Sequence, residues 1–251
     1  MKKEFYEMRV RFLILFIITI ILFFSIAPFQ KIYVNMIEEN ITVIKTYAEK
    51  FGIANMIENL NDWNYYIYTQ WFGKNFGQML PIFAIIAAFP LFSREFENGT
   101  MEYLMVRKSR DYIFLSKVYS GLILLFLLVI FGNVLPIVYS NLFNKNFNSI
   151  IAYKYMIHGL FGVLFWYEVT VFFSIIFNDQ VKPILSSIGL LAITTALGFI
   201  KPLNFLNTYI YILGNNILKY GKIDWTYSIY LFVLGEIIAS LAYYTFKNKE
   251  I

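Results

Sequence analysis

The sequence has no cysteine, a single histidine and few charged residues. Without cysteine, the chain of 251 residues has no disulfide framework and no thiolate metal site. Asp, Glu, Lys and Arg make up only 15% of the residues, whereas an ordinary soluble domain has roughly 25%. These scarcities exclude a disulfide-rich secreted domain and a cysteine-based zinc site, and they argue against a soluble fold.

The usual motifs of enzyme active sites are absent too. The sequence contains no H-E-x-x-H, no G-x-S-x-G and no phosphate-binding G-x-x-x-x-G-K-[ST] motif. The one histidine, His158, falls at the outer end of a predicted span, where hydrogen bonding is more typical than metal ligation. We therefore expect no catalytic residue, no metal site and no cofactor on this chain, so that any nucleotide would be bound by another chain.

Long apolar runs dominate what is present. The chain is 59% hydrophobic and 20% aromatic, and six segments approach or exceed the ~20 apolar residues that a helix needs to cross a bilayer. The sequence thus predicts an all-α polytopic membrane protein with one transmembrane domain over residues 1–251. The predicted spans are 10–28, 76–92, 115–139, 155–177, 184–200 and 226–246.

The basic residues predict how these spans are oriented. If both termini are cytoplasmic, twelve Lys and Arg residues lie inside, among them every arginine, and nine lysines lie in the longer outside loops. This asymmetry is the one that membrane insertion favours. The net charge of +5 then reflects topology, and we expect a lipid bilayer as the surroundings and no nucleic acid as a partner. The inside set is Lys2, Lys3, Arg9, Arg11, Arg94, Arg107, Lys108, Arg110, Lys117, Lys182, Lys247 and Lys249.

Two outer segments have patterns of their own. In the predicted extracellular loop 29–75, apolar residues recur at helical spacing from Ile37 to Phe51, and an aromatic cluster follows at 63–73. The cluster is typical of an interfacial anchor, and an external gate is the alternative. The second segment, 201–225, is too polar for a span and too apolar for a free loop, so we expect a re-entrant or surface-lying element.

Two carboxylates lie within predicted spans. A charge at the bilayer centre costs at least ~2.5–3.5 kcal/mol, so such residues usually face a bundle interior or a water-filled path. Glu168 and Glu236 are placed at similar depth and are candidates for a translocation path. The alternative is that each is protonated or hydrogen-bonded to a neighbouring helix and only fixes packing.

The segment 93–114 is the one sizeable loop predicted on the cytoplasmic side. Asn98 is a candidate N-cap for a short helix whose Met101, Leu104 and Met105 share an apolar face. Ser109 is a candidate cap for the helix that continues into the third span. A solvated, positive-inside loop would have a similar composition, so periodicity alone leaves both interpretations open.

The motifs of this loop allow a comparison with a known protein family. The segment resembles the first cytoplasmic loop of the ABC-2 type permeases, the membrane subunits of a class of ATP-driven exporters, which carries E-x-x-x-G-T-[LM]-E-x-L followed by S-R-x-x-I-x-x-x-K. A proline that usually precedes the S-R pair is replaced here by Val106-Arg107-Lys108. The matching residues are Glu95, Gly99, Thr100, Met101, Glu102, Leu104, Ser109, Arg110, Ile113 and Lys117.

This resemblance implies a fold and a set of partners. The expected fold is the ABC-2, type V exporter-like fold, with six spans, both termini cytoplasmic and a re-entrant segment between spans five and six. The loop would carry a coupling helix that docks on a separate ATP-binding subunit, which holds the ATP and Mg²⁺, and a second permease copy or paralogue would complete a dimer in the plasma membrane of a prokaryote. The implied coupling residues are Glu95, Glu97, Gly99, Thr100, Met101, Glu102, Leu104 and Met105.

Three functions are compatible with the sequence. The first is a permease subunit that exports a hydrophobic or amphipathic cargo such as a peptide, a drug or a lipid-like molecule, and that is not itself an enzyme. The second is an ion-coupled secondary transporter that uses Glu168 and Glu236 as proton or cation carriers. The third is a sensor or immunity protein that holds a ligand without moving it.

Overall fold

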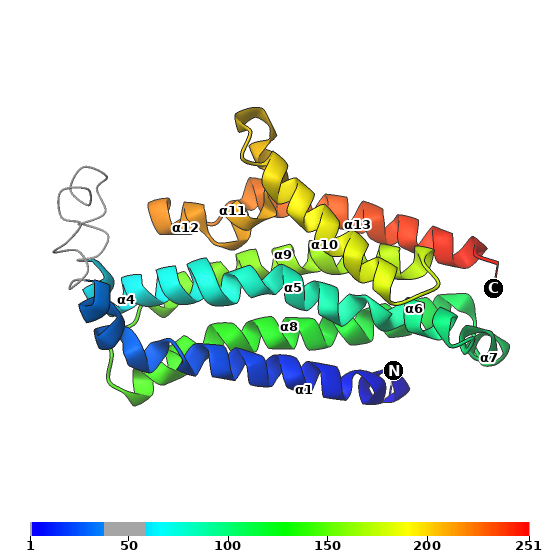
Figure 1. Ribbon diagram of the computed structural model, residues 1–251, viewed down its shortest axis with the longest axis horizontal. Coiled ribbons are helices and arrows are strands. Elements are labelled where there is room, and N and C mark those ends of the chain that lie inside the picture. The colour runs from blue at the N-terminus through cyan, green and yellow to red at the C-terminus, as the bar shows by residue number, and fades with distance from the viewer. Residues whose placement is uncertain (1, 38–58, 251) are drawn as a thin grey trace.

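The computed structural model describes residues 2–37 and 59–250, and within these ranges the chain is helical and contains no strand (Figure 1). A further helical stretch covers residues 30–37. The other elements are α1 (Lys2–Phe24), η1 (Ala27–Phe29), η2 (Asn59–Asn61), α4 (Trp63–Tyr66), η3 (Ile67–Asn75), α5 (Phe76–Ala88), α6 (Pro90–Glu97), α7 (Met101–Arg107), α8 (Arg110–Leu142), α9 (Ser149–Ile176), α10 (Val181–Leu197), η4 (Lys201–Leu206), α11 (Thr208–Ile212), α12 (Asn215–Tyr220) and α13 (Trp225–Asn248).

Five helices in the described ranges are long and apolar enough to cross a membrane, and they contain or overlap five of the six predicted spans. They cover Glu4–Ile37, Trp63–Glu97, Arg110–Leu142, Ser149–Ile176 and Trp225–Asn248. The predicted span 184–200 overlaps α10, which has 17 residues and a length of about 25 Å, a little short of the ~30 Å hydrocarbon core. The sixth span therefore stays a prediction.

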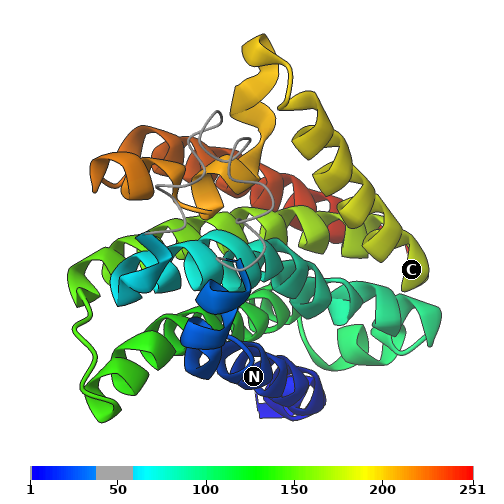
Figure 2. The same ribbon diagram turned by 60° about the vertical axis from the view of Figure 1, so that its left-hand side comes forward.

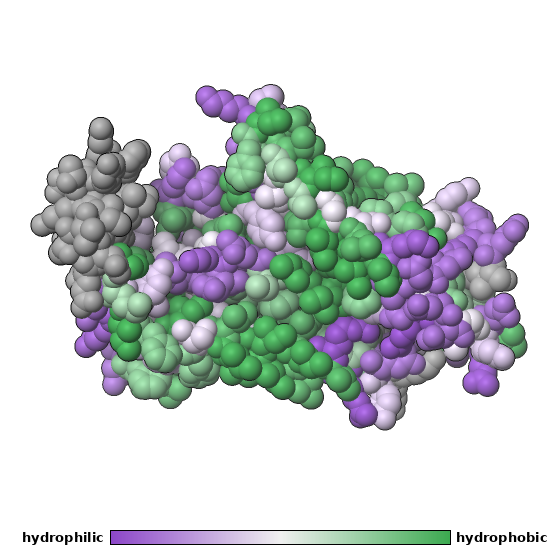
Figure 3. Space-filling model, viewed as in Figure 1, coloured by the Kyte–Doolittle hydropathy of each residue, from purple (hydrophilic) through white to green (hydrophobic). Residues whose placement is uncertain are grey.

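The central helix of the bundle is α9, which packs against α13, α5 and α8, while α1 packs on α8. Figures 1 and 2 show these helices side by side, with the end of α10 and η4 projecting from the bundle. The side chains of Trp166 and Tyr167 in α9 are fully buried, and Tyr167 Oη donates to the Val118 carbonyl of α8 at 2.7 Å. Apolar side chains cover the middle of the surface, and polar ones gather at the end that holds α7 (Figure 3).

The aromatic cluster at 63–73 is helical and most of its aromatic side chains are buried in the bundle, so its assignment to a loop is wrong, while its role as an interfacial anchor or an external gate stays a prediction. A continuous helical run from Trp63 to Glu97 contains the cluster, with a π-helical stretch, η3, before the predicted start of the second span. Trp71 is fully buried, donates from Nε1 to the Gly132 carbonyl at 2.9 Å and stacks on Phe76. Aromatic composition suits both a membrane interface and a core, and here packing between helices decides.

The predicted outer loop 29–75 is also shorter than expected, because residues 30–37 and 63–75 are helical. The predicted amphipathic helix from Ile37 to Phe51 falls almost entirely outside the described residues. The segment 201–225, which is predicted to lie outside, forms η4, α11 and α12, and it turns at Gly214 (φ 68°) and Gly221 (φ 63°), where a left-handed backbone favours glycine. Ile212 of α11 is buried against α9, so the segment packs on the bundle, and its re-entrant or surface-lying position in a membrane stays a prediction.

The α7 end of the bundle also holds both ends of the described chain (Figure 1). Side-chain contacts fix this arrangement, because Lys117 near the start of α8 pairs with Glu4 of α1, and Lys249 lies over the ring of Phe96 in α6. The termini therefore share one side of the bundle with the predicted coupling loop.

Replacing Gly162 with valine tests the packing of α11 on α9. A Cβ at Gly162 would lie 2.4 Å from Cγ1 of Ile212, and overpacking of this kind costs about 1–3 kcal/mol. We expect Gly162→Val to lower the melting temperature of the purified protein in detergent. Gly189→Val is the matched control, because a Cβ at that helical glycine meets nothing within 4 Å; equal melting temperatures for the two variants would contradict the packing.

Candidate functional site

The predicted coupling loop is a tight elbow between α6 and α7. The Gly99 N–H donates to the Phe96 carbonyl at 3.2 Å and the Thr100 N–H donates to the Glu95 carbonyl at 2.9 Å, which together form a Schellman ending for α6. Gly99 has φ 65°, a left-handed conformation that a side chain would strain. Asn98 closes α6 and Thr100 precedes α7, so the prediction of Asn98 as the N-cap of the short helix is wrong.

A buried ionic network fixes this elbow to the bundle. Lys117 is 2% exposed, and its Nζ lies 3.1 Å from Oε2 of Glu4 and 3.1 Å from Oε1 of Glu95. Thr100 Oγ1 donates to the other carboxylate oxygen of Glu95. Three matched motif residues, Glu95, Thr100 and Lys117, thus hold the elbow through one cation that also binds α1. A second ion pair between α6 and α1 joins Arg94 to Glu7.

The apolar face of α7 is turned toward its own chain. Met101 is fully buried, and Leu104 and Met105 are half-buried against the core. The resemblance implies that these three side chains dock on the ATP-binding subunit, but Met101 is closed to direct contact with a partner, because the periodicity of a short helix does not tell which body its apolar face contacts. Glu95 is likewise buried by its pairing with Lys117.

The outward face of α7 is made of other residues. Tyr103 is 73% exposed and Val106 is 87% exposed, with Glu102 and Arg107 also at the surface. We call Glu102, Tyr103, Val106 and Arg107 the elbow face. An exposed tyrosine and valine between charges of both signs offer a small apolar patch with a polar rim, as protein interfaces do.

Glu97 is exposed at the end of α6 and contacts the connection between α9 and α10. Its Oε2 accepts from Gln180 Nε2 at 2.5 Å. At the start of α10, the Asp179 carboxylate pairs with Lys182 and accepts from the N–H groups of Val181 and Lys182, and these contacts lower the pKa of Asp179. The elbow therefore touches the helix pair α9–α10 as well as α1.

Two basic side chains bind the C-terminal carbonyls of helices at this end. Arg110 Nη1 donates to the carbonyls of Phe246, Lys247 and Lys249 at 2.8–2.9 Å, which caps α13 from the start of α8. Lys249 Nζ donates to the Ile175 carbonyl at the end of α9 at 2.6 Å. Cations are favourable at helix C-termini, so these contacts tie the ends of α13 and α9 to the elbow.

Ser109, as predicted, caps α8. Its Oγ accepts from the Tyr112 N–H at 3.3 Å. Ile113 is 5% exposed within the core. The S-R-x-x-I-x-x-x-K half of the motif therefore caps two helix ends, fills the core and supplies the buried cation.

The two intramembrane carboxylates differ in exposure. Glu168 in α9 is 6% exposed, and its Oε2 has no hydrogen-bond partner among the described residues. It points at Gly235 of α13, where a Cβ would lie 2.0 Å from Oε2. Glu236, the next residue, is exposed on α13. The helices thus bring the two glutamates of the predicted path close together, one inside the bundle and one on its surface.

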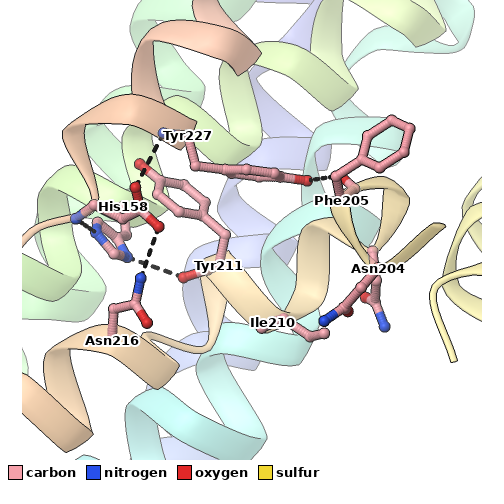
Figure 4. A pocket seen from close by; sticks show the side chains of 9 residues that line it. His158, Asn204, Phe205, Ile210, Tyr211, Asn216 and Tyr227 are labelled. Atoms are coloured by element: carbon pink, nitrogen blue, oxygen red, sulfur yellow. Dashed lines mark hydrogen bonds between the residues drawn. The ribbon is translucent and has the colours of Figure 1, made fainter. Parts of the chain in front are cut away.

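A pocket of about 160 Å³ is lined by His158 of α9 and by residues of η4, α11 and the start of α13 (Figure 4). The Asp224 N–H donates to His158 Nε2 at 3.0 Å, so the proton lies on Nδ1, which is 2.9 Å from the Tyr211 carbonyl oxygen. Both ring nitrogens are used within the chain, and this confirms the prediction of a hydrogen-bonding histidine. The described residues contain no group of three or more His, Cys, Asp or Glu side chains that could hold a metal ion.

Sequence reasoning missed several residues of the elbow. Lys117 and Arg110 belong to the matched motif, so the sequence indicated that they matter but did not predict which residues they contact. Glu4 and Lys249 lie near opposite ends of the chain, and only the folded bundle brings them to the elbow.

Replacing Lys117 with methionine tests the ionic network. The variant leaves Glu4 and Glu95 buried without their cation, and loss of one partner of a buried pair costs about 3–5 kcal/mol. We expect Lys117→Met to lower the melting temperature in detergent strongly, and added Glu4→Gln and Glu95→Gln substitutions to restore part of the loss.

The control is Lys182→Met, which removes an exposed ion pair to Asp179 and should cost about 1 kcal/mol or less. A Lys117→Met protein as stable as the Lys182→Met protein would show that the network does not hold the elbow.

Comparison with known protein families agrees with the motif in the elbow. A family model described as "ABC-2 family transporter protein" matches residues 1–251. Comparisons with curated proteins and with solved structures gave no match. Family members are membrane components that work with an ATP-binding partner. With its helical bundle of membrane-length helices, this chain belongs to the ABC-2 family of transporter proteins.

Proposed function

We propose that the chain is the permease subunit of an ATP-driven exporter and that the elbow is its coupling site for a separate ATP-binding subunit. One observation supports this proposal most directly: the elbow face is exposed, while other residues next to the elbow bind it to the rest of the bundle. Tyr103 and Val106 are open to a partner, while Lys117 and Arg110 join the same elbow to α1 and α13.

The contacts suggest how a docked subunit would act on the spans. Movement of α7 would pull on α6 through the Schellman turn, on α1 through the Glu95–Lys117–Glu4 network, and on α13 through Arg110. ATP can drive such movement only if the docked subunit favours one arrangement of the spans over another. In this proposal, buried Glu95 and Met101 and half-buried Thr100 transmit the movement, whereas exposed Glu102 contacts the partner directly.

The rest of the assembly follows from the same proposal. ATP and Mg²⁺ are held by the partner subunit, and two permeases, identical or paralogous, form the path between them. In this assembly α10 serves as the fifth of six spans and both termini are cytoplasmic, in the plasma membrane of a prokaryote. The cargo is hydrophobic or amphipathic, because the spans are rich in apolar and aromatic residues.

Ion-coupled secondary transport is the alternative that one observation favours. Glu168 has an oxygen without a hydrogen-bond partner among the described residues, close to exposed Glu236, and buried carboxylates of this kind serve as proton relays in some transporters. Transport by the proposed exporter should stop when ATP hydrolysis in the partner subunit is blocked. Transport that instead follows an imposed proton gradient would favour the alternative.

Charged substitutions on the elbow face test the coupling site. Tyr103→Asp and Val106→Asp place a carboxylate at the centre of the small apolar patch, where truncation of an anchor residue typically costs about 2 kcal/mol or more. We expect at least about tenfold weaker association with the ATP-binding subunit that co-purifies with the wild-type chain, measured by quantitative pull-down from detergent.

The matched control is Tyr220→Asp, since Tyr220 is 70% exposed in the outer segment far from α7 in sequence. It should leave association unchanged. Unaltered association of both elbow variants, or a wild-type chain that binds no ATP-binding subunit, would contradict the proposal.

A further inference from the structure

The pocket in Figure 4 is enclosed by several elements of the chain: α9, η4, α11, α12 and the start of α13 each contribute to its lining. His158 and Tyr211 are buried at its base, whereas Asn204, Phe205 and Ile210 are exposed at its rim. Its volume of about 160 Å³ is close to the ~150 Å³ of a cavity that takes up one benzene molecule. A small organic molecule with a ring-sized body therefore fits.

Aromatic rings form the walls of this pocket, and hydrogen bonds fix their positions. The ring of Tyr211 stacks on His158 with 4.0 Å between the centroids, and it lies 5.0 Å from the ring of Tyr227. Tyr227 Oη donates to the Phe205 carbonyl at 2.6 Å, and Tyr211 Oη lies 2.6 Å from Oγ of Ser228. Because both hydroxyls are held by the chain, the walls are in place before a ligand arrives, which lowers the cost of binding.

One carboxylate adds a charge to the aromatic lining. Asp224 lines the pocket and also an adjoining hollow of about 420 Å³, which shares Phe205 and Tyr227 with it. The carboxylate accepts from Asn216 Nδ2 at 2.7 Å and from the Tyr227 N–H at 3.0 Å. Both donors are neutral, and a carboxylate has about four acceptor sites. Asp224 therefore caps α13 and still has acceptor sites for a ligand.

The charge of Asp224 is not balanced by a cation of the described residues. None of their basic side chains forms an ion pair with it or lines either hollow. Lys154 donates to the Gly221 carbonyl instead. The lining thus disfavours an anion. A metal ion fits poorly too, since hard cations take about six oxygen ligands and the described residues contain no metal-binding group of three or more His, Cys, Asp or Glu side chains.

We propose that this pocket binds a small organic molecule with a primary ammonium group and an apolar, ring-sized body. The ammonium group donates hydrogen bonds to Asp224 and lies near the ring of Tyr227, since aromatic faces attract cations. The body packs among the rings. A quaternary ammonium group has no N–H to donate to the carboxylate, so the primary group is favoured. Binding here goes beyond the proposed transport function and does not depend on it.

Titration with an amine and its neutral analogue tests the site. The full chain, purified in the uncharged detergent dodecyl maltoside, is titrated at neutral pH with phenethylamine and separately with phenethyl alcohol, and binding is measured by calorimetry. The two compounds are similar in size, and the amine alone is charged under these conditions. We expect saturable binding of the amine and at least about tenfold weaker binding of the alcohol, because hydrogen bonds between charged groups are stronger than neutral ones.

Two variants locate the binding. Asp224→Asn keeps a good helix cap but removes the charge, and we expect at least about tenfold weaker binding of the amine. Asp62→Asn is the matched control, because Asp62 caps α4 and does not line the pocket, and it should leave the affinity unchanged. Ile210→Trp fills the rim at a 37% exposed position and should abolish binding without lowering the melting temperature. No saturable binding of the amine, equal binding of the alcohol, or unchanged affinity in either pocket variant would overturn the proposal.

A lipid headgroup is a second source of the same ammonium chemistry. Phosphatidylethanolamine carries a primary ammonium group, and phosphatidylcholine has the same net charge without an N–H. We expect neither lipid, when added to the micelles, to weaken the binding of phenethylamine, because the phosphate of the headgroup would approach Asp224 and repel it. Competition by phosphatidylethanolamine alone would overturn the free amine as the ligand and assign the pocket to the headgroup.

Discussion

The elbow end of the bundle depends on one buried cation. Lys117 is almost completely enclosed and has a carboxylate on either side, Glu4 from α1 and Glu95 from α6. A buried charge is tolerated only when it is paired and hydrogen-bonded, so the three helices α1, α6 and α8 have to meet at this point. Thr100 donates a hydrogen bond to Glu95 from the far side of the turn. Because Thr100 directly precedes α7, this bond also fixes where α7 begins.

Backbone carbonyls extend this fixed point to the rest of the bundle. Arg110 donates hydrogen bonds to the carbonyls at the C-terminal end of α13. Lys249, which directly follows α13, donates hydrogen bonds to the last carbonyls of α9. Both interactions place a cation at the negative end of a helix, where backbone acceptors lack intrahelical partners. The helix ends on this side of the bundle are thereby held by charged side chains.

The sequence predicted the helices and the important loop better than it predicted their contacts. Apolar runs indicated the long helices because membrane-length hydrophobicity is a local property, and the motif singled out Glu95, Thr100 and Lys117 correctly as a group. Their pairing depends on the approach of α1, which no local pattern encodes. The cluster around Trp71 shows the same limit, since aromatic residues suit a membrane interface and a helical core equally well, and only the neighbouring helices decide between them.

The close approach of α9 and α13 connects the elbow with the intramembrane carboxylates. Glu168 lies against Gly235, and a glycine at this position permits contact but provides no side chain to lock the two helices together. The end of α13 is held by Arg110 at the start of α8, so in the proposed exporter a displacement of the elbow would reach α13, and the surroundings of Glu168, through this contact.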